Sequence, residues 1–222
     1  GGGSIPHPGE ISLAHNGVLF LDEFPEFSKE SLEALRQPME DKSISISRAN
    51  YKTTFPADFM LIATMNPCPC GYYGDPTHQC KCSAQQIENY QKKLSGPLFD
   101  RIDMYLEVEK VENDLLLKNS AKNTLKHSVV KNTITEGLFR QHLRYKKDGF
   151  FNSSLTSFEV SKLLHLEPDA EKLLQNASEK MSLSARSYFK VIKVAQTIAD
   201  LENSPTIKPP HIAEALTFRR RF

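Results

Sequence analysis

Two short apolar runs, each ending in polar residues, stand out in the first half of the chain. Residues 17–23 (GVLFLDE) are too short and too rich in β-forming residues for a core helix and predict a buried strand, and residues 58–66 (DFMLIATMN) predict a second strand. Residues 28–41 between them carry a helical pattern with Ser28 as the N-cap, and residues 43–56 predict a hairpin. Strands that alternate with helices favour a parallel α/β sheet.

The second half of the chain lacks strand patterns and carries helical periodicity instead. Apolar residues recur at helical spacing in 157–166 (SFEVSKLLHL), 168–181 (PDAEKLLQNASEKM), 184–202 (SARSYFKVIKVAQTIADLE) and 208–220 (KPPHIAEALTFRR). We therefore expect two domains, a mixed α/β region over residues 1–111 and an all-helical region over residues 112–222.

Composition narrows the class of protein but not its partners. The 222 residues are 39% hydrophobic and 25% charged, as in an ordinary globular protein, and the net charge of +1 says little about partners. No apolar run approaches the length of a membrane span, and the N-terminal GGGSIPHPGE is no signal peptide, so we expect a cytoplasmic protein. The chain does not begin with Met, and we expect it to be a fragment of a longer parent.

Adjacent carboxylates follow the first apolar run. Ligands of an open α/β sheet bind at the carboxyl ends of its strands, where Asp22 and Glu23 would lie. Mg²⁺ prefers oxygen ligands and substrate phosphates, and a second carboxylate can polarise water for attack on phosphorus. The pair therefore fits a Walker B element, with Asp22 in the Mg²⁺ shell and Glu23 as the base. Two solvated acids at a strand end are the alternative.

Three further polar residues appear in an order that sharpens this interpretation. Asn66 ends the second strand and could bond the attacking water or the γ-phosphate. Arg101 follows in GPLFDRID, and Arg186 lies near the start of a helix in LSARSYFKV; a guanidinium suits phosphate oxygens. This ordered set is the layout of an AAA+ ATPase.

With these motifs, the chain resembles the magnesium-chelatase-like AAA+ proteins of bacteria, of the ComM type. The resemblance rests on PGEISLAHNGVLFLDEFPEF, LRQPMED, MNPCPCG, SGPLFDRID and LSARSYFKVIKVAQTIADL, and covers essentially the whole chain. It implies the C-terminal part of an AAA+ parallel-sheet core followed by an all-helical lid domain. It also implies ATP and Mg²⁺ as cofactors, a ring that is usually hexameric, and DNA handling in natural transformation and recombination.

The same resemblance implies a role for each residue. Asp22 and Glu23 form Walker B, Asn66 is sensor 1, Arg101 is the arginine finger acting on a neighbouring subunit, and Arg186 is sensor 2. A phosphate-binding P-loop needs Gly followed by Lys, and none of the 10 glycines here is followed by Lys. Walker A is therefore expected N-terminal to this chain, which alone should hydrolyse ATP negligibly.

Four cysteines form a second constellation in CPCGYYGDPTHQCKC. Cys68 and Cys70 face Cys80 and Cys82 across a short loop and could supply four thiolates to a tetrahedral Zn²⁺ ion. The C-x-C spacing is tighter than the common C-x-x-C, and unligated thiols are the alternative. A reducing cytosol makes disulfides a poor explanation.

DNA contacts are harder to place. Arg48 and Lys52 lie near the tip of the predicted hairpin, where basic residues could track phosphates, or simply be solvated. Residues 118–147 hold eight Lys or Arg against Glu136 alone, as either a nucleic-acid surface or a solvated helix face.

Three function classes stay open: an ATP-driven DNA motor, a chelatase-type motor that remodels a protein partner, and a non-catalytic zinc-bearing interaction module.

Overall fold

The computed structural model describes residues 6–48, 51–108 and 123–219. The chain divides into two compact units, residues 1–102 and residues 103–222. Each unit is described by itself. The first mixes helices and strands, whereas the second is helical over its described part apart from one isolated β-bridge between Leu166 and Ile207. The predicted boundary between residues 111 and 112 lies outside the described residues.

A small parallel sheet forms the centre of the first unit. Strand β1 (Val18–Leu21) pairs in parallel with β4 (Met60–Ala63), and Leu21 lies opposite Ala63. Both predicted strands are therefore confirmed, but β4 ends at Ala63, so Asn66 lies three residues beyond the strand that it was expected to end. Because the strands run in the same direction and end in register, the polar residues that follow them emerge at one edge of the sheet.

The prediction that the first strand is buried is wrong for one face of the sheet. Val18 and Phe20 are 54% and 56% exposed, and Met60 and Ile62 opposite them are 62% and 44% exposed. Side chains alternate between the two faces of a strand, and only the face with Leu19 and Leu21 packs against the core. Among the described residues, β1 and β4 are the only strands of this sheet.

The first unit also contains several short helices. They are α1 (Glu10–Leu13), the 3₁₀ turn η1 (Phe24–Glu26), α2 (Lys29–Ala34), α3 (Pro38–Asp41), α4 (Ala84–Lys92) and α5 (Gly96–Phe99). The predicted N-cap is confirmed, since the Ser28 hydroxyl accepts a hydrogen bond from the Ser31 amide. The single helix predicted over 28–41 is instead split into α2 and α3, because Pro38 lacks an N–H and occupies the first turn of a helix.

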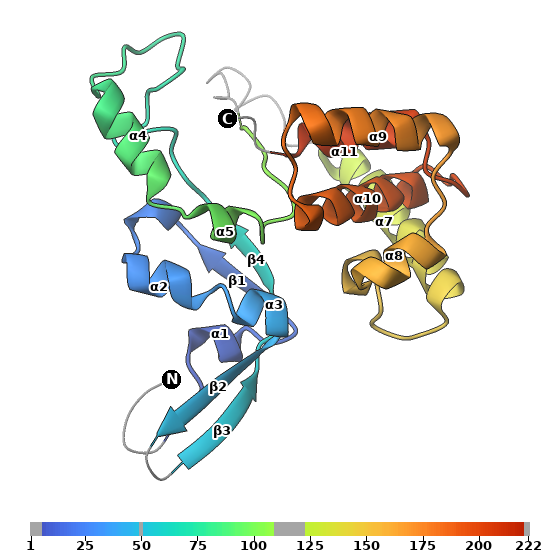
Figure 1. Ribbon diagram of the computed structural model, residues 1–222, viewed down its shortest axis with the longest axis horizontal. Coiled ribbons are helices and arrows are strands. Elements are labelled where there is room, and N and C mark those ends of the chain that lie inside the picture. The colour runs from blue at the N-terminus through green and yellow to red at the C-terminus, as the bar shows by residue number, and fades with distance from the viewer. Residues whose placement is uncertain (1–5, 49–50, 109–122, 220–222) are drawn as a thin grey trace. The chain divides into compact units, whose positions relative to one another are not determined.

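The predicted hairpin is confirmed as an antiparallel ribbon. Strand β2 (Ser43–Arg48) pairs with β3 (Tyr51–Pro56), with Ser43 opposite Pro56 and Arg48 opposite Tyr51. In Figure 1 this hairpin extends away from the β1–β4 sheet, and the loop that leads into α4 lies at the opposite end of the unit.

The core of the unit is built by Phe24, Leu32, Leu35, Leu94 and Leu98, all nearly inaccessible to solvent.

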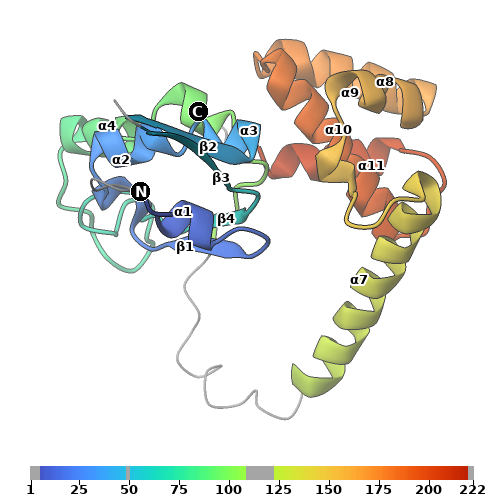
Figure 2. The same ribbon diagram turned by 90° about the horizontal axis from the view of Figure 1, so that it is seen from below.

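The second unit is a helical assembly around α10. Its elements are α7 (Asn123–Tyr145), the 3₁₀ turn η2 (Asn152–Ser154), α8 (Ser157–Leu163), α9 (Pro168–Lys180), α10 (Ala185–Leu201) and α11 (Pro209–Thr217). All four predicted helices of this half are confirmed. Figure 2 shows the N-terminal half of α7 extending away from the other helices of this unit.

The core of the second unit combines an apolar centre with one buried polar network. Val191, Ala195 and Ile198 of α10 form one apolar cluster with buried residues of α8, α9 and α11. Beside them the carboxylate of Asp200, fully buried, accepts hydrogen bonds from Arg144 and from the side-chain amide of Asn152. None of the described helices is both long and apolar enough to cross a membrane.

Candidate functional site

The carboxyl edge of the parallel sheet carries Asp22 directly beside Thr64. The register that places Leu21 opposite Ala63 brings these two next residues together, and the Thr64 hydroxyl donates a hydrogen bond to Asp22 Oδ1. Two backbone hydrogen bonds flank this pair. The Thr64 amide donates to Leu21 O at 3.0 Å, and the Phe24 amide donates to Thr64 O at 2.8 Å. Asp22 is thus held by its neighbour while its side chain remains exposed to solvent.

Glu23 occupies an unusual backbone conformation at this edge. Its φ of 50° and ψ of 48° lie in the left-handed region, which residues with a Cβ seldom adopt. Its amide donates to the Thr64 hydroxyl at 3.1 Å and to Asp22 Oδ1 at 3.2 Å, so two hydrogen bonds hold the turn. The 3₁₀ turn η1 follows at once, with Phe24 as its first residue and Pro25 as its second. The chain therefore leaves the strand sharply, and the carboxylate of Glu23 is exposed at the sheet edge.

Asn66 lies two residues beyond Thr64, and its backbone lies near the phenol of Tyr90. The phenol of Tyr90 interacts with the backbone N–H of Asn66 and feels the charges of Glu23 and Glu26. Burial, followed by these negative charges, raises the pKa of Tyr90. Asp22 and Glu23 thus lie at the carboxyl edge of the sheet, and Asn66 follows two residues after Thr64 at the same edge, with Tyr90 of α4 near its backbone.

Arg101 follows α5 in the same unit and is engaged by it. Its guanidinium donates to Pro97 O at 2.7 Å and Arg36 O at 3.0 Å, and pairs with the carboxylate of Glu40 in α3. The side chain is 15% exposed. In the single chain the predicted arginine finger is therefore held within its own unit.

Arg186 lies in the first turn of α10, in the second unit. One turn later, the ammonium of Lys190 pairs with Asp103 Oδ1 at 2.8 Å. Burial lowers the pKa of Lys190, and the positive charges of Arg219 and Arg186 act in the same direction. Arg186 thus lies beside Lys190 and Arg219 in a group of basic residues on the second unit.

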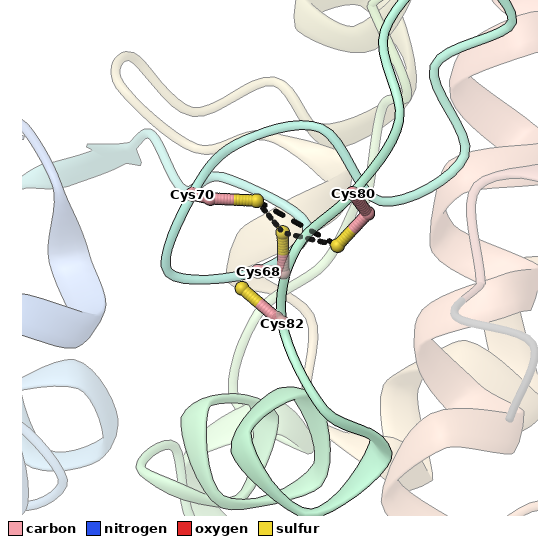
Figure 3. A group of neighbouring side chains, drawn as sticks. All are labelled: Cys68, Cys70, Cys80 and Cys82. Carbon is pink, nitrogen blue, oxygen red and sulfur yellow. Dashed lines mark hydrogen bonds between the residues drawn. The ribbon is translucent and has the colours of Figure 1, made fainter.

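The four cysteines converge in the loop between β4 and α4 (Figure 3). All four sulfur atoms lie within 4.8 Å of one another. The Sγ of Cys68 is 3.4 Å from that of Cys70 and 3.7 Å from that of Cys80, and 3.6 Å separates Cys70 from Cys80. A disulfide would need about 2.05 Å between two sulfurs, so these are separate thiols. The expected convergence of the two C-x-C pairs is thereby confirmed.

Backbone amides surround part of this cluster. The amides of Tyr72 and Lys81 act on Cys70 and lower the pKa of its thiol to about 6. Burial raises the pKa of Cys82 to about 12. Their neighbour Cys68 has 0% of its surface exposed. Four convergent sulfurs, one of them fully buried, form a group that can hold a metal ion.

The two predicted DNA-contacting residues belong to the hairpin. Arg48 ends β2 and Lys52 is the second residue of β3, where its side chain is exposed. Of the basic stretch 118–147, residues 118–122 lie outside the described residues, and two of its described arginines are engaged within the second unit. Arg140 donates to Asp200 O at 2.7 Å, and Arg144 pairs with the buried carboxylate of Asp200. These two arginines stabilise the second unit.

Three residues of the site were missed by sequence reasoning. Thr64 has a sequence signal, because it follows the second strand as Asp22 follows the first. Glu40 and Tyr90 have none, since their partners are distant in the chain: Arg101 is 61 residues from Glu40, and the contact between Tyr90 and Asn66 depends on how the loop returns.

Comparisons with known proteins give one family for the whole chain. The family model described as "Magnesium chelatase, subunit ChlI" matches residues 1–116. The model described as "Magnesium chelatase, subunit ChlI C-terminal" matches residues 100–219. The two models overlap and together cover nearly all of the sequence.

Individual relatives point to one branch of that family. The chain is 45% identical over 220 residues to "Competence protein ComM" of Haemophilus influenzae and 42% identical over 219 residues to "Uncharacterized protein YifB" of Salmonella typhimurium. These matches cover 99% of this chain but 42% of either relative, so the chain spans about two fifths of their length. It is also 24% identical over 214 residues to "DNA replication licensing factor Mcm6" of Drosophila melanogaster, covering 93% of this chain and 25% of that protein. The chain therefore belongs to the magnesium chelatase ChlI family of AAA+ ATPases, and within it resembles the ComM type.

Proposed function

We propose that this chain is the C-terminal part of a ring-forming AAA+ ATPase that couples ATP hydrolysis to DNA remodelling, of the branch-migration or helicase type, in natural transformation and recombination. The observation that carries the proposal is the common sheet edge, where Thr64 contacts both Asp22 and the Glu23 amide and Asn66 follows two residues later. Family membership supports the ATPase, and the similarity to a competence protein and a replication licensing factor supports DNA as the substrate.

Each residue has a distinct task in this proposal. Asp22, oriented by Thr64, is the protein ligand of a Mg²⁺ ion, which supplies charge neutralisation at the phosphate oxygens of ATP. Glu23 orients and deprotonates the attacking water, and Asn66 donates a hydrogen bond to that water or to the γ-phosphate. Arg186 binds phosphate from the helical unit, which acts as the lid.

The arginine finger requires an assembly. Arg101 acts on nucleotide bound by a neighbouring subunit of a ring, which we propose to be hexameric. To do so it must exchange its acceptors Glu40 and Pro97 O for phosphate oxygens. This exchange would make hydrolysis dependent on the approach of a neighbour, since the guanidinium is engaged within its own unit before that.

A chelatase-type motor that remodels a protein partner is the second candidate, because both matching family models carry the description of magnesium chelatase. Both candidates use the same ATPase residues and differ in the macromolecule that stimulates turnover. A structural Zn²⁺ ion at the four cysteines and a cytoplasmic location, where thiols stay reduced, are parts of both proposals.

The decisive experiment uses a longer parent protein that includes the P-loop. Glu23→Gln should retain ATP binding and lose at least about a hundredfold in turnover, the usual contribution of a general base. Glu30→Gln on the exposed side of α2 is the matched control and should leave turnover unchanged.

The choice of macromolecule is tested with the same protein. Stimulation of hydrolysis by single-stranded, duplex or branched DNA would support the DNA motor, and its absence would favour the chelatase-type alternative. Full turnover in Glu23→Gln would contradict both. The 222-residue chain by itself should hydrolyse ATP negligibly.

A further inference from the structure

The cysteine cluster has the dimensions of a four-coordinate metal site. A tetrahedral ion with metal–sulfur bonds of about 2.3 Å has sulfur–sulfur edges of about 3.8 Å. Three edges of the cluster measure 3.4, 3.6 and 3.7 Å, and Cys82 Sγ completes the group within 4.8 Å. A multi-iron cluster would force these sulfurs farther apart, because its iron atoms each bind a different cysteine. The spacing therefore fits one ion with four thiolate ligands, for which Zn²⁺ is the usual choice.

The cluster joins two segments that are separated by a long loop. Cys68 and Cys70 come from the segment that follows β4, whereas Cys80 and Cys82 precede α4 (Figure 3). Directly after Cys82, Ser83 caps α4 through a capping box with Gln86. An ion at the cluster would therefore fix the start of α4 relative to the segment that carries Asn66.

Helix α4 then returns to the same segment at its other end. The Gln91 side-chain amide donates to Pro67 O at 3.2 Å, and the Tyr90 phenol interacts with the backbone N–H of Asn66. Tyr90 is 5% exposed, so its ring is held by packing. Residues 66–68 are thus contacted by two parts of the unit. Helix α4 contacts Asn66 and Pro67, and Cys68 belongs to the sulfur cluster.

The far end of α4 is also tied to the turn that begins at Glu23. Lys93, which caps α4, pairs with the Glu26 carboxylate at 3.2 Å and lies 5.4 Å from the centre of the Tyr90 ring. Glu23 and Glu26 both act electrostatically on the Tyr90 phenol. One short helix therefore connects the cysteine cluster, the Asn66 backbone and the Glu23 turn.

From these contacts we infer that Cys68, Cys70, Cys80 and Cys82 bind a Zn²⁺ ion that positions the Asn66 segment by fixing α4 with its Tyr90 and Gln91. The ion has no role in the chemistry. Its four ligands close the loop of residues 68–82, and Tyr90 transmits that constraint to the backbone of Asn66. The positional effect stands on the contacts alone, whereas its catalytic meaning rests on the proposed function.

The first test is metal analysis of the 222-residue chain purified with reductant. We expect about one zinc ion per chain and no stoichiometric iron. Cys68→Ser and Cys82→Ser should lose the zinc, whereas Tyr73→Ala in the same loop, with an exposed side chain, should retain it. Zinc far below one per chain, iron in its place, or full zinc in Cys82→Ser would overturn the inference.

The second test follows the amide of Asn66 by hydrogen exchange, with and without zinc. Removal of zinc by a chelator should speed this exchange about tenfold, as expected when a local constraint is released, and leave the amides of α10 in the other unit unchanged. Tyr90→Phe should retain zinc, because the cysteines are unchanged. The exchange of the Asn66 amide should nevertheless speed up, because the phenol oxygen that interacts with this amide is removed. Equal exchange rates with and without zinc would overturn the positioning role.

The third test separates this inference from the proposed function. In the longer parent, Tyr90→Phe and Cys82→Ser should lower kcat while leaving the KM for ATP within about twofold, because the affected residue acts on the water and not on binding. A parent that binds zinc, protects Asn66 in a zinc-dependent manner and hydrolyses no ATP would contradict the ATPase proposal and support the positional role of zinc.

Discussion

The guanidinium of Arg101 pairs with the carboxylate of Glu40, 61 residues earlier in the chain. Two backbone oxygens, of Pro97 and Arg36, accept its other N–H groups. The residue proposed to act on a neighbour's nucleotide therefore joins α3 to α5 within its own unit. The same side chain serves the fold of the single chain and the chemistry of the proposed ring.

Removal of the Arg101 side chain should therefore lower the stability of the isolated chain. Arg101→Ala leaves two backbone acceptors and a carboxylate without this partner, and we expect the free energy of unfolding to fall by about 1–3 kcal/mol. Glu40→Ala should cost at most about 1 kcal/mol, because the Glu40 side chain is 43% exposed and the pair is screened by water. Urea denaturation followed by circular dichroism measures both. Unfolding of Arg101→Ala at the wild-type urea concentration would show that the contacts are not formed in solution.

The buried carboxylate of Asp200 should be essential for the second unit. It is 0% exposed and accepts hydrogen bonds from Arg144, Asn152 and Gln196. Asp200→Ala leaves Arg144 without its anion, and we expect a loss of about 3–5 kcal/mol. Asp148→Ala is the control, because that side chain is 98% exposed and should change stability by less than about 0.5 kcal/mol. Similar melting temperatures for the two variants would contradict this account.

The cysteine loop contains a carboxyl group with a low pKa. Hydrogen bonds from the Thr77 hydroxyl, followed by those from the Thr77 and His78 amides, lower the pKa of Asp75 from 3.8 to about 2. Because the folded-state value is the lower one, Asp75 stabilises the folded chain above about pH 4 and loses that contribution as the pH falls toward 2. Carbon-detected NMR of the Asp75 carboxyl should show a midpoint near 2, and Thr77→Ala should move it toward 3.8. An unchanged midpoint in Thr77→Ala would assign the shift to another group.

The hairpin should carry part of any DNA affinity of the longer parent. Lys52 is exposed on β3, and Arg48 ends β2 one pair nearer the turn. Replacing both by Ala should weaken binding to all sequences alike and reduce the slope of log K against log salt by about 2, because each phosphate contact contributes about 0.9. Lys92→Ala on α4 is the control, since its side chain is 70% exposed and lies outside the hairpin. Identical salt slopes for the hairpin variant and this control would remove the hairpin from the DNA interface.

Local patterns were sufficient to predict most elements of the fold. The apolar runs before Glu23 and Asn66 became paired strands, and the alternation in SISIS and YKTTFP became β2 and β3. The helical periodicity of the second half also held, because α8, α9, α10 and α11 each contribute buried apolar residues to one shared core. The single helix predicted over residues 28–41 was the exception, because Pro38 begins a second helix within that segment.

The site was predictable only where it depends on strand ends. Asp22 and Glu23 lie at the edge expected for them, because parallel strands in register end together. The contacts of Arg101 with Glu40 and of Tyr90 with Asn66 join distant segments, and no periodic pattern encodes them. The exposure of Phe20 was likewise hidden, because a run of apolar residues does not reveal what lies above each face of its sheet.

That uncovered face has a practical consequence for work on this chain in isolation. The exposed apolar surface of this face consists of Val18, Phe20, Met60 and Ile62. Among the described residues, no further strand lies beside either outer edge of this two-stranded sheet. Such a surface favours self-association during concentration and storage. The chain should bind the dye ANS strongly. Replacing Phe20 and Ile62 by threonine should reduce both ANS binding and self-association.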